Sequence, residues 1–239
     1  MKKIDIYFHV FLTDHPHTFS IFNEQIFLLH SSGLLYSSNS VNICIVHASN
    51  NNKIIDDAQN LIKIYNLNDN IHIRQISSHG DECLTGRVMM EDYKTIEDDR
   101  YVLYFHTKGA SHCGRETEIY TKSWRHFMEY YCIENWKNCI TKLDLGFESA
   151  GVLWLNHIYC NHPHLENKEG DGFYAGSFYW IKSSILNQII KINGLSTSRY
   201  CMEEMPAIIK HKHFSFNNFP LDNDINFYQE IYHPKNYIL

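Results

Sequence analysis

The sequence predicts an α/β fold, built as a single Rossmann-like domain with a mostly parallel central sheet flanked by helices. Short apolar runs alternate along the chain with longer segments whose apolar residues recur at helical spacing. The first pattern is typical of buried strands and the second of amphipathic helices, and their alternation indicates βαβ units. No low-complexity linker, internal repeat or change of composition divides the chain, so one domain over residues 1–239 is expected.

The first three elements follow directly from these patterns. Residues 4–12 are rich in β-branched and aromatic side chains and predict a strand. Residues 19–29 carry apolar side chains at helical spacing, and Gly33 is expected to end that helix. A run of Val, Ile and Cys at residues 41–46 predicts the second strand.

The next elements repeat the alternation. Residues 56–65 are expected to form a short helix, residues 70–76 alternate apolar and polar side chains as a strand does, and residues 82–96 are helical again. The strand at residues 101–105 is wholly apolar or aromatic and is expected to be buried. The half up to about residue 110 therefore resembles a nucleotide-binding unit. It lacks G-x-G-x-x-G and G-x-x-x-x-G-K-[ST], which argues against ordinary dinucleotide binding and P-loop phosphoryl transfer.

The second half of the chain contains the longest helical pattern, at residues 116–143, where large apolar side chains recur at i+3 and i+4. Core packing is the simplest role for its tryptophans and tyrosines. The remaining predicted elements are strands at residues 150–156 and 173–181 and helical segments at residues 183–192 and 199–209.

Composition excludes several classes of function. The net charge is −6 and no long basic tract is present, which argues against a dedicated nucleic-acid binder. The first residues are too polar for a signal peptide, and no apolar run approaches the ~20 residues that span a bilayer. A cytoplasmic protein is expected, with at most peripheral contact at the inner face of a membrane.

Cysteine and histidine usage points to neither a disulfide framework nor a zinc cage. The seven cysteines form no C-x-x-C pair and most lie in apolar surroundings, so buried, reduced thiols are expected. The sixteen histidines show no structural-zinc spacing with a partner pair.

The stretch that carries the clearest chemistry follows the strand at residues 101–105. The apolar run changes abruptly to His106, Thr107, Lys108 and Gly109, which marks a strand end that opens into a loop. In an open α/β sheet, ligands bind outside the carboxyl ends of the strands. A cation, a hydroxyl and a glycine that permits close approach suit a phosphate-bearing ligand. The alternative is a basic surface loop without a ligand.

A second stretch of interest is the set of small residues Ala175, Gly176 and Ser177 among the aromatic side chains of residues 173–181. Small residues in a strand let a ligand or another backbone approach closely.

These motifs together resemble a known group of enzymes. His106 to Gly109, the pair Trp124 and Arg125, the run from Gly151 to Trp154, residues 173–180 and a later glutamate-bearing helix occur in the order seen in GT-A-like glycosyltransferases of bacterial and viral polysaccharide biosynthesis. The H-T-K-G stretch is similar to the H-T-K signature of rhamnan-synthesis-type proteins. The resemblance spans roughly residues 4–210.

The resemblance implies that the half at about 1–110 holds a nucleotide-sugar donor and the half at about 111–239 the acceptor and the catalytic groups. It assigns the donor phosphates to His106, Thr107, Lys108, Gly109, Arg87 and Arg125. It assigns the sugar or acceptor to Trp154, Tyr174, Ala175, Gly176 and Ser177.

The sequence departs from the family at the metal motif. Many GT-A enzymes carry Asp-x-Asp after the fourth strand, whereas this chain has the His106 stretch there, and its Asp98–Asp99 pair precedes the strand. Lys108, with Arg125 or Arg87, would then neutralise the leaving diphosphate in place of a divalent cation. No metal ligand is assigned, and Mn²⁺ or Mg²⁺ stays an open cofactor.

An inverting transfer needs a carboxylate that accepts the proton of the acceptor hydroxyl. Glu203 and Glu204 match the acidic helix of the family, and Asp171 is the reserve. Adjacent helical residues do not share a face, so at most one of the two glutamates is expected to act; a solvated helix face is the alternative for both. His47 and residues 50–52 could contact the nucleobase or ribose, or merely fill a loop.

The leading hypothesis is a glycosyltransferase that moves a sugar from a nucleotide-sugar donor to a glycan, lipid-linked glycan or polysaccharide acceptor. Two alternatives stay open: a non-catalytic nucleotide- or glycan-binding module of the same fold, and a metal-dependent hydrolase built on the histidines. Nucleophilic catalysis is poorly supported, because the chain has no G-x-S-x-G elbow.

Overall fold

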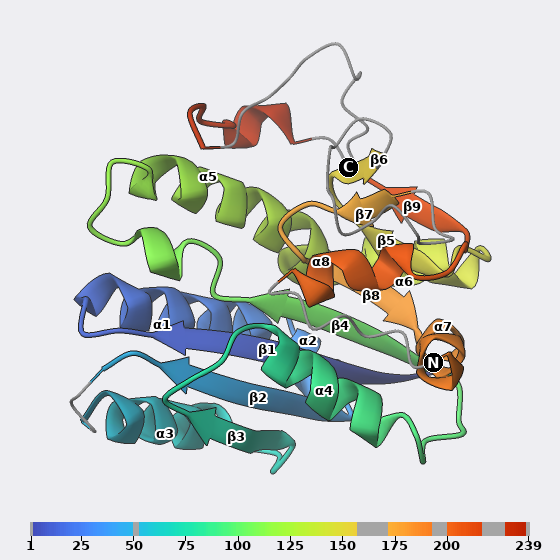
Figure 1. The fold of residues 1–239 in the computed structure, drawn as a ribbon, viewed down its shortest axis with the longest axis horizontal. Helices are drawn as coiled ribbons and strands as arrows, with labels where there is room; N and C mark the ends of the chain where they lie inside the picture. Colours follow the sequence, from blue (N-terminus) through green and yellow to red (C-terminus); the bar gives the residue numbers. More distant parts are fainter. Residues whose placement is uncertain (1, 50–52, 157–171, 193–199, 217–227, 238–239) are drawn as a thin grey trace.

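A computed structural model describes residues 2–49, 53–156, 172–192, 200–216 and 228–237 (Figure 1). These residues form a seven-stranded sheet in the order β3-β2-β1-β4-β8-β5-β9, with a separate two-stranded sheet of β6 and β7. The strands of the large sheet are β1 Lys3–Leu12, β2 Ser40–His47, β3 Ile71–Ser77, β4 Arg100–His106, β5 Ser149–Gly151, β8 Tyr179–Lys182 and β9 His213–Ser215.

The sheet is mostly parallel, as the sequence predicts. β3, β2, β1 and β4 run parallel to one another, and β9 runs parallel to β5. β8 is antiparallel to both of its neighbours, β4 and β5. The antiparallel β8 matters for the site, because its register pairs Tyr179 with Tyr104 and so places the chain before β8 beside the carboxyl end of β4.

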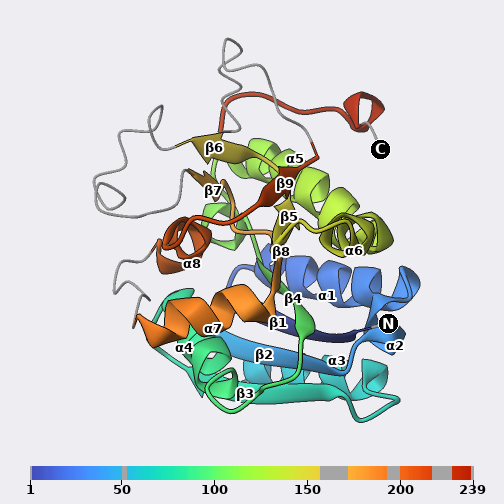
Figure 2. The ribbon, with the colours of Figure 1, turned by 90° about the vertical axis from the view of Figure 1, so that its right-hand side faces the viewer.

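Helices cover both faces of the sheet (Figure 2). The core on one face packs β1 against α1, α3, α5 and α6, and the core on the other face packs it against α4, α7 and α8. β1 shows the alternation that this requires: Ile6 and Phe8 belong to the first core and Tyr7 to the second. The helices are α1 Pro16–Ser31, α2 Leu34–Ser37, α3 Lys53–Tyr65, α4 Cys83–Asp92, α5 Glu118–Glu129, α6 Trp136–Asp144, α7 Ser183–Lys191 and α8 Cys201–Glu204.

Most predicted elements are present with shifted ends, but the long helix at residues 116–143 is not continuous. A π-helical turn (Tyr130–Glu134) and Asn135 separate α5 from α6. The side chains on both sides of the break are buried in one core, so apolar spacing alone could not reveal the interruption.

Two predicted strands are each divided. Residues 150–156 give β5 and then β6 (Trp154–Asn156), because Leu153 adopts a positive φ of 57° and ends the pairing with the central sheet. Residues 173–181 give β7 (Gly172–Tyr174), a tight turn and then β8. The small residues of the second segment therefore belong to a turn, in which Gly176 has φ 87° and Ser177 has φ 59°.

The expectation that every cysteine is a free thiol is wrong for one pair. Cys83, at the start of α4, is bonded to Cys201, at the start of α8, across a sequence separation of 118. Both helices pack in the same core, which brings these distant positions together. Of the other cysteines in the described ranges, Cys44, Cys132 and Cys139 are buried free thiols, as predicted.

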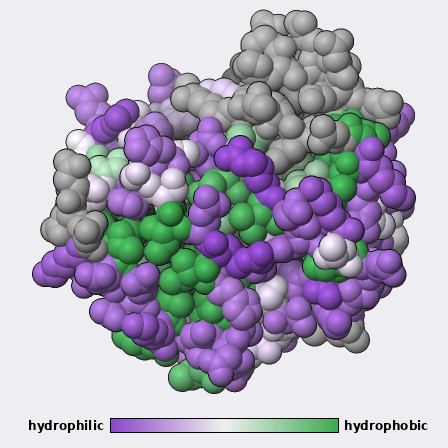
Figure 3. All heavy atoms as spheres, turned by 60° about the horizontal axis from the view of Figure 1, so that its bottom comes forward, coloured by the Kyte–Doolittle hydropathy of each residue, from purple (hydrophilic) through white to green (hydrophobic). Residues whose placement is uncertain are grey.

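Figure 3 presents the side that carries β3 and α3 and shows apolar side chains gathered among hydrophilic ones. β3 is an edge strand and leaves Ile76 36% exposed. Within the described ranges, no helix combines the length and apolar character needed to cross a membrane.

Candidate functional site

A cavity of about 660 Å³ opens at the carboxyl ends of β1 and β4. This is the edge of the sheet at which α/β proteins bind ligands. Charged and titratable side chains from five segments line it, among them His9, Glu82, His106, Lys108, Arg115, Glu203 and Tyr228. The predicted loop at His106 to Gly109 forms one wall of this cavity.

Hydrogen bonds between Thr107 and the backbone of β1 hold that wall in place. The Thr107 hydroxyl oxygen accepts a hydrogen bond from the Phe11 N–H at 2.8 Å, and the Thr107 N–H donates to the His9 carbonyl at 3.0 Å. Gly109 has φ +88°, and a Cβ there would lie 3.0 Å from the Thr121 hydroxyl oxygen. Thr107 and Gly109 therefore shape the loop, whether or not they also contact a ligand.

Lys108 is the cation of this wall. Its half-buried side chain lines the cavity, and its Nζ lies 3.9 Å from the centre of the Trp124 ring. The ring face attracts the ammonium group and holds it in one place without neutralising it. Arg115, which was not singled out in the sequence, adds an exposed cation to the same cavity.

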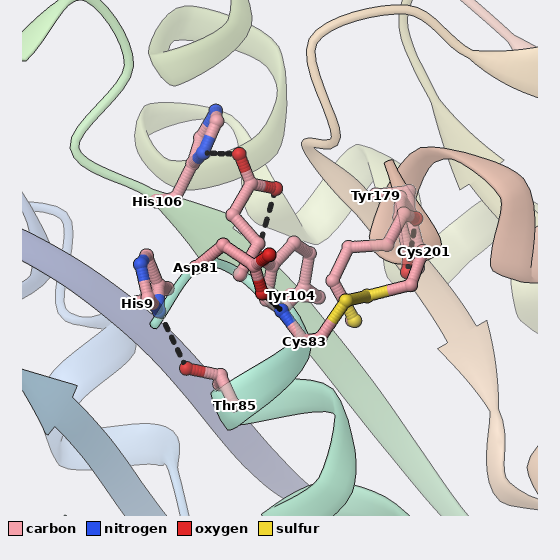
Figure 4. The surroundings of a disulfide bond; sticks show 10 residues. His9, Asp81, Cys83, Thr85, Tyr104, His106, Tyr179 and Cys201 are labelled. Atoms are coloured by element: carbon pink, nitrogen blue, oxygen red, sulfur yellow. Dashed lines mark hydrogen bonds and ion pairs between the residues drawn. A yellow bond between two sulfur atoms is a disulfide. The ribbon is translucent and has the colours of Figure 1, made fainter. Parts of the chain in front are cut away.

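The same wall carries a carboxylate–histidine pair, in which His106 (Figure 4) contacts Glu82, the residue that precedes α4. Glu82 Oε1 lies 2.6 Å from His106 Nδ1, and Glu82 Oε2 accepts a hydrogen bond of 3.1 Å from the Tyr104 hydroxyl. Burial pushes the pKa of Glu82 upward, but the charge and hydrogen bond of His106, aided by His9 and Lys108, outweigh it and lower the pKa from 4.5 to about 2. Glu82 is thus ionised at neutral pH.

His9 completes this wall. The parallel register places it directly beside His106, and its Nδ1 lies 2.9 Å from the Thr85 hydroxyl oxygen (Figure 4). Burial, and then the charge of His106, lower the pKa of His9 from 6.5 to about 4, although Glu82 acts in the other direction. The sequence held a signal for both residues as members of a ligand site. His9 is a histidine within an apolar strand, Glu82 follows the end of a strand, and both positions fall at the edge of the sheet where ligands bind.

Of the two glutamates predicted to be catalytic, one lines the cavity and the other does not. Glu203 lines the cavity, and its Oε1 accepts a hydrogen bond from the Gly176 N–H at 2.9 Å. Glu204 points elsewhere: it is 1% exposed, does not line the cavity, and neither carboxylate oxygen has a hydrogen-bond partner among the described residues. Asp171 and residues 50–52 lie outside the described ranges.

Two predicted phosphate ligands do not line the cavity. The Arg125 guanidinium is 3% exposed and contacts Glu24 at 2.7 Å and Glu129 at 3.2 Å. It also donates a hydrogen bond of 3.3 Å to the Lys108 carbonyl, so it supports the loop from behind instead of facing the ligand side. Arg87 is exposed on α4 and lies outside the lining of the cavity.

The predicted sugar-binding set serves the interior of the protein. A Cβ on Gly176 would lie 2.6 Å from Met128 Sδ, so the close approach at this glycine comes from the protein itself. Tyr174 is fully buried, and its hydroxyl donates a hydrogen bond to the Phe214 carbonyl. The Trp154 ring stacks on the His213 ring with a distance of 3.8 Å between the ring centres. Ala175 and Ser177 are also buried, and none of the five predicted positions lines the cavity. His47 is likewise outside the lining, with its Nδ1 3.2 Å from the Ser49 carbonyl.

Three carboxylates of the cavity already have partners within the protein. Glu82 is engaged by His106 and Tyr104, Glu203 by Gly176, and Asp81 Oδ1 accepts a hydrogen bond from the Cys83 N–H. Across the described ranges, no group of three or more His, Cys, Asp or Glu side chains is placed to hold a metal ion.

The low pKa of His9 predicts acid-sensitive stability. Because the folded protein binds the proton of His9 only near pH 4 and the unfolded chain near pH 6.5, stability from this group is lost as the pH falls from 6.5 to 4. The expected loss is on the order of 3 kcal/mol. Urea unfolding of wild type and His9→Asn across this range checks it. The variant should show a shallower pH dependence, and parallel curves would contradict the assignment.

Comparisons with known proteins assign neither a family nor a function to the chain. No protein-family model and no curated protein matches the chain. Among solved structures, 4-diphosphocytidyl-2C-methyl-D-erythritol synthase from Anaerococcus prevotii DSM 20548 is similar over 93% of this chain and 92% of that chain. The two sequences are 11% identical and the TM-score is 0.39, which is too low to support any inference about function.

Proposed function

We propose that this protein is a glycosyltransferase that moves a sugar from a nucleotide-sugar donor to a glycan or polysaccharide acceptor. The observation that carries the proposal is that Lys108 and Glu203 line one cavity at the carboxyl end of β4. A cation suits the donor diphosphate, and a carboxylate suits sugar hydroxyls. The volume of about 660 Å³ falls in the range of small-molecule sites.

The charges of the cavity are arranged for such a ligand. Lys108 and Arg115 meet the diphosphate on one side, where they stabilise the negative charge that builds up as the nucleoside diphosphate leaves. Asp81, just before α4, and Glu203, on α8, also line the cavity, and in this proposal they accept hydrogen bonds from sugar hydroxyls. Lys108 stands over the Trp124 ring, which leaves its N–H groups available for phosphate oxygens.

The test is a thermal-shift panel of nucleoside diphosphates and nucleotide sugars, each with and without Mn²⁺. A ligand that binds only the folded protein raises the melting temperature by mass action. A selective shift with one nucleoside diphosphate is expected, and it names the donor base. Release of that nucleoside diphosphate when a glycan acceptor is added distinguishes a transferase from a binding module. A flat panel under both conditions would overturn the proposal.

A further inference from the structure

Several buried contacts hold the His106–Glu82 pair in one geometry. Glu82 is held at both oxygens, by His106 Nδ1 at 2.6 Å and by the Tyr104 hydroxyl at 3.1 Å. Tyr104 is fully buried, and the His106 ring lies edge-on to the Phe178 ring with a centroid separation of 5.6 Å. These contacts fix the orientation of the imidazole and direct one nitrogen to the carboxylate.

The other nitrogen, Nε2, has no hydrogen-bond partner in the part of the chain that the structure describes. His106 is only 8% exposed, and among the described residues nothing forms a hydrogen bond with its Nε2. Leaving a buried polar atom without a hydrogen bond costs free energy, so such atoms in folded proteins ask for a specific explanation. His106 lines the proposed donor cavity beside Lys108, which makes a ligand in that cavity the natural partner.

We propose that His106 is the general base of the transfer and that Glu82 is the positioning residue that orients it. This assignment rests on the proposed function. In a direct displacement, the O–H bond of the acceptor breaks and His106 Nε2 takes the proton while the oxygen bonds to the anomeric carbon. The bond from that carbon to the diphosphate oxygen breaks, and its electron pair leaves with the nucleoside diphosphate, whose charge Lys108 meets.

The groups packed around His106 are suited to this role. Glu82 stays ionised at neutral pH and stabilises the imidazolium that forms, as a carboxylate behind a catalytic histidine does. His9, beside it on β1, is a weak base because burial lowers its pKa to about 4. The tyrosines that approach Glu82, Tyr104 from β4 and Tyr179 from β8, have pKa values raised by burial and stay protonated. Glu203, the carboxylate expected from the sequence, has one oxygen engaged by Gly176.

The experiment combines calorimetric binding of the nucleoside diphosphate with the pH profile of its release. His106→Gln is expected to bind the diphosphate within a few-fold of wild type, to lose about 10²- to 10⁴-fold in kcat, and to lose the acidic limb of the profile. Glu82→Gln is expected to lower kcat and move that limb, and Glu82→Asp to restore part of the rate. His72→Gln, an exposed histidine on β3, is the matched control and should equal wild type.

The outcomes separate the two proposals. Normal kcat and an unchanged pH profile in a folded His106→Gln protein would overturn the assignment of the base while leaving the transferase in place. Absence of any nucleotide binding by wild type would overturn the proposed function, and this assignment with it. If His106→Gln fails to fold, Glu82→Gln decides with His106 intact: a uniformly lower rate without a shift of the limb would contradict the positioning role.

Discussion

Replacing Lys108 by methionine is expected to weaken binding of the donor diphosphate about 10- to 100-fold, because a hydrogen bond between a charged donor and a phosphate contributes about 1.5 to 3 kcal/mol. Methionine retains an apolar stem against the Trp124 ring, so the loss reports on the charge and not on packing. Transfer should slow further than binding weakens, since the ammonium also stabilises the leaving diphosphate. Isothermal titration and the rate of nucleoside diphosphate release measure the two effects.

Lys122→Met is the matched control for this variant. Lys122 is exposed on α5 and lies outside the cavity, so its loss removes one positive charge without touching the site. Lys108→Arg should recover part of the affinity, because a guanidinium also donates to phosphate oxygens. Equal diphosphate affinity in Lys108→Met, Lys122→Met and wild type would remove Lys108 from the donor site.

Gly176→Ala is expected to destabilise the fold by about 2 to 5 kcal/mol, with loss of activity as a secondary effect. Two costs add: a left-handed backbone at a non-glycine residue, about 1 to 2 kcal/mol, and overpacking of the core, about 1 to 3 kcal/mol. The overpacking arises because the new Cβ would lie 2.6 Å from Met128 Sδ and 3.1 Å from Trp124. Urea-induced unfolding, followed by circular dichroism, gives the free energy of unfolding.

Gly146→Ala separates these costs. Gly146 has φ +97°, and a Cβ there would meet nothing within 4 Å, so it carries the backbone cost without the clash. We expect it to lose only about 1 to 2 kcal/mol. If Gly176→Ala proved no more destabilising than Gly146→Ala, the close packing of the turn before β8 against α5 would be refuted.

The first half of the fold could be predicted from the sequence because its signals are local. The apolar strands β1, β2 and β4 are each bounded by polar loops, and the change at His106 marks the loop that carries Lys108. The rule that ligands gather at the carboxyl edge of a parallel sheet pointed to this loop, and Lys108 lines the cavity there.

The rest depends on tertiary contacts that no local pattern records. The antiparallel entry of β8 converts the predicted small-residue strand into a turn that packs on α5 and offers its Gly176 N–H to Glu203. Arg125 shares a sequence neighbourhood with Trp124, yet Glu24, about one hundred residues away in the chain, draws its guanidinium to the other side of the loop. Glu82 gains its partner only when α4 packs over β1, since β1 lies next to the β4 strand that carries His106.

The bond between Cys83 and Cys201 makes half of the chain a covalent ring. β4, α5, α6, β5, β8 and α7 all lie between its two ends, across a sequence separation of 118. If the protein is pulled by its two termini, force passes through the bridge and the ring cannot extend. Reduction would add roughly 400 Å of contour length, at about 3.5 Å for each released residue. In the oxidised protein, only the segments before Cys83 and after Cys201 can therefore be extended by force, and the residues between them bear no load.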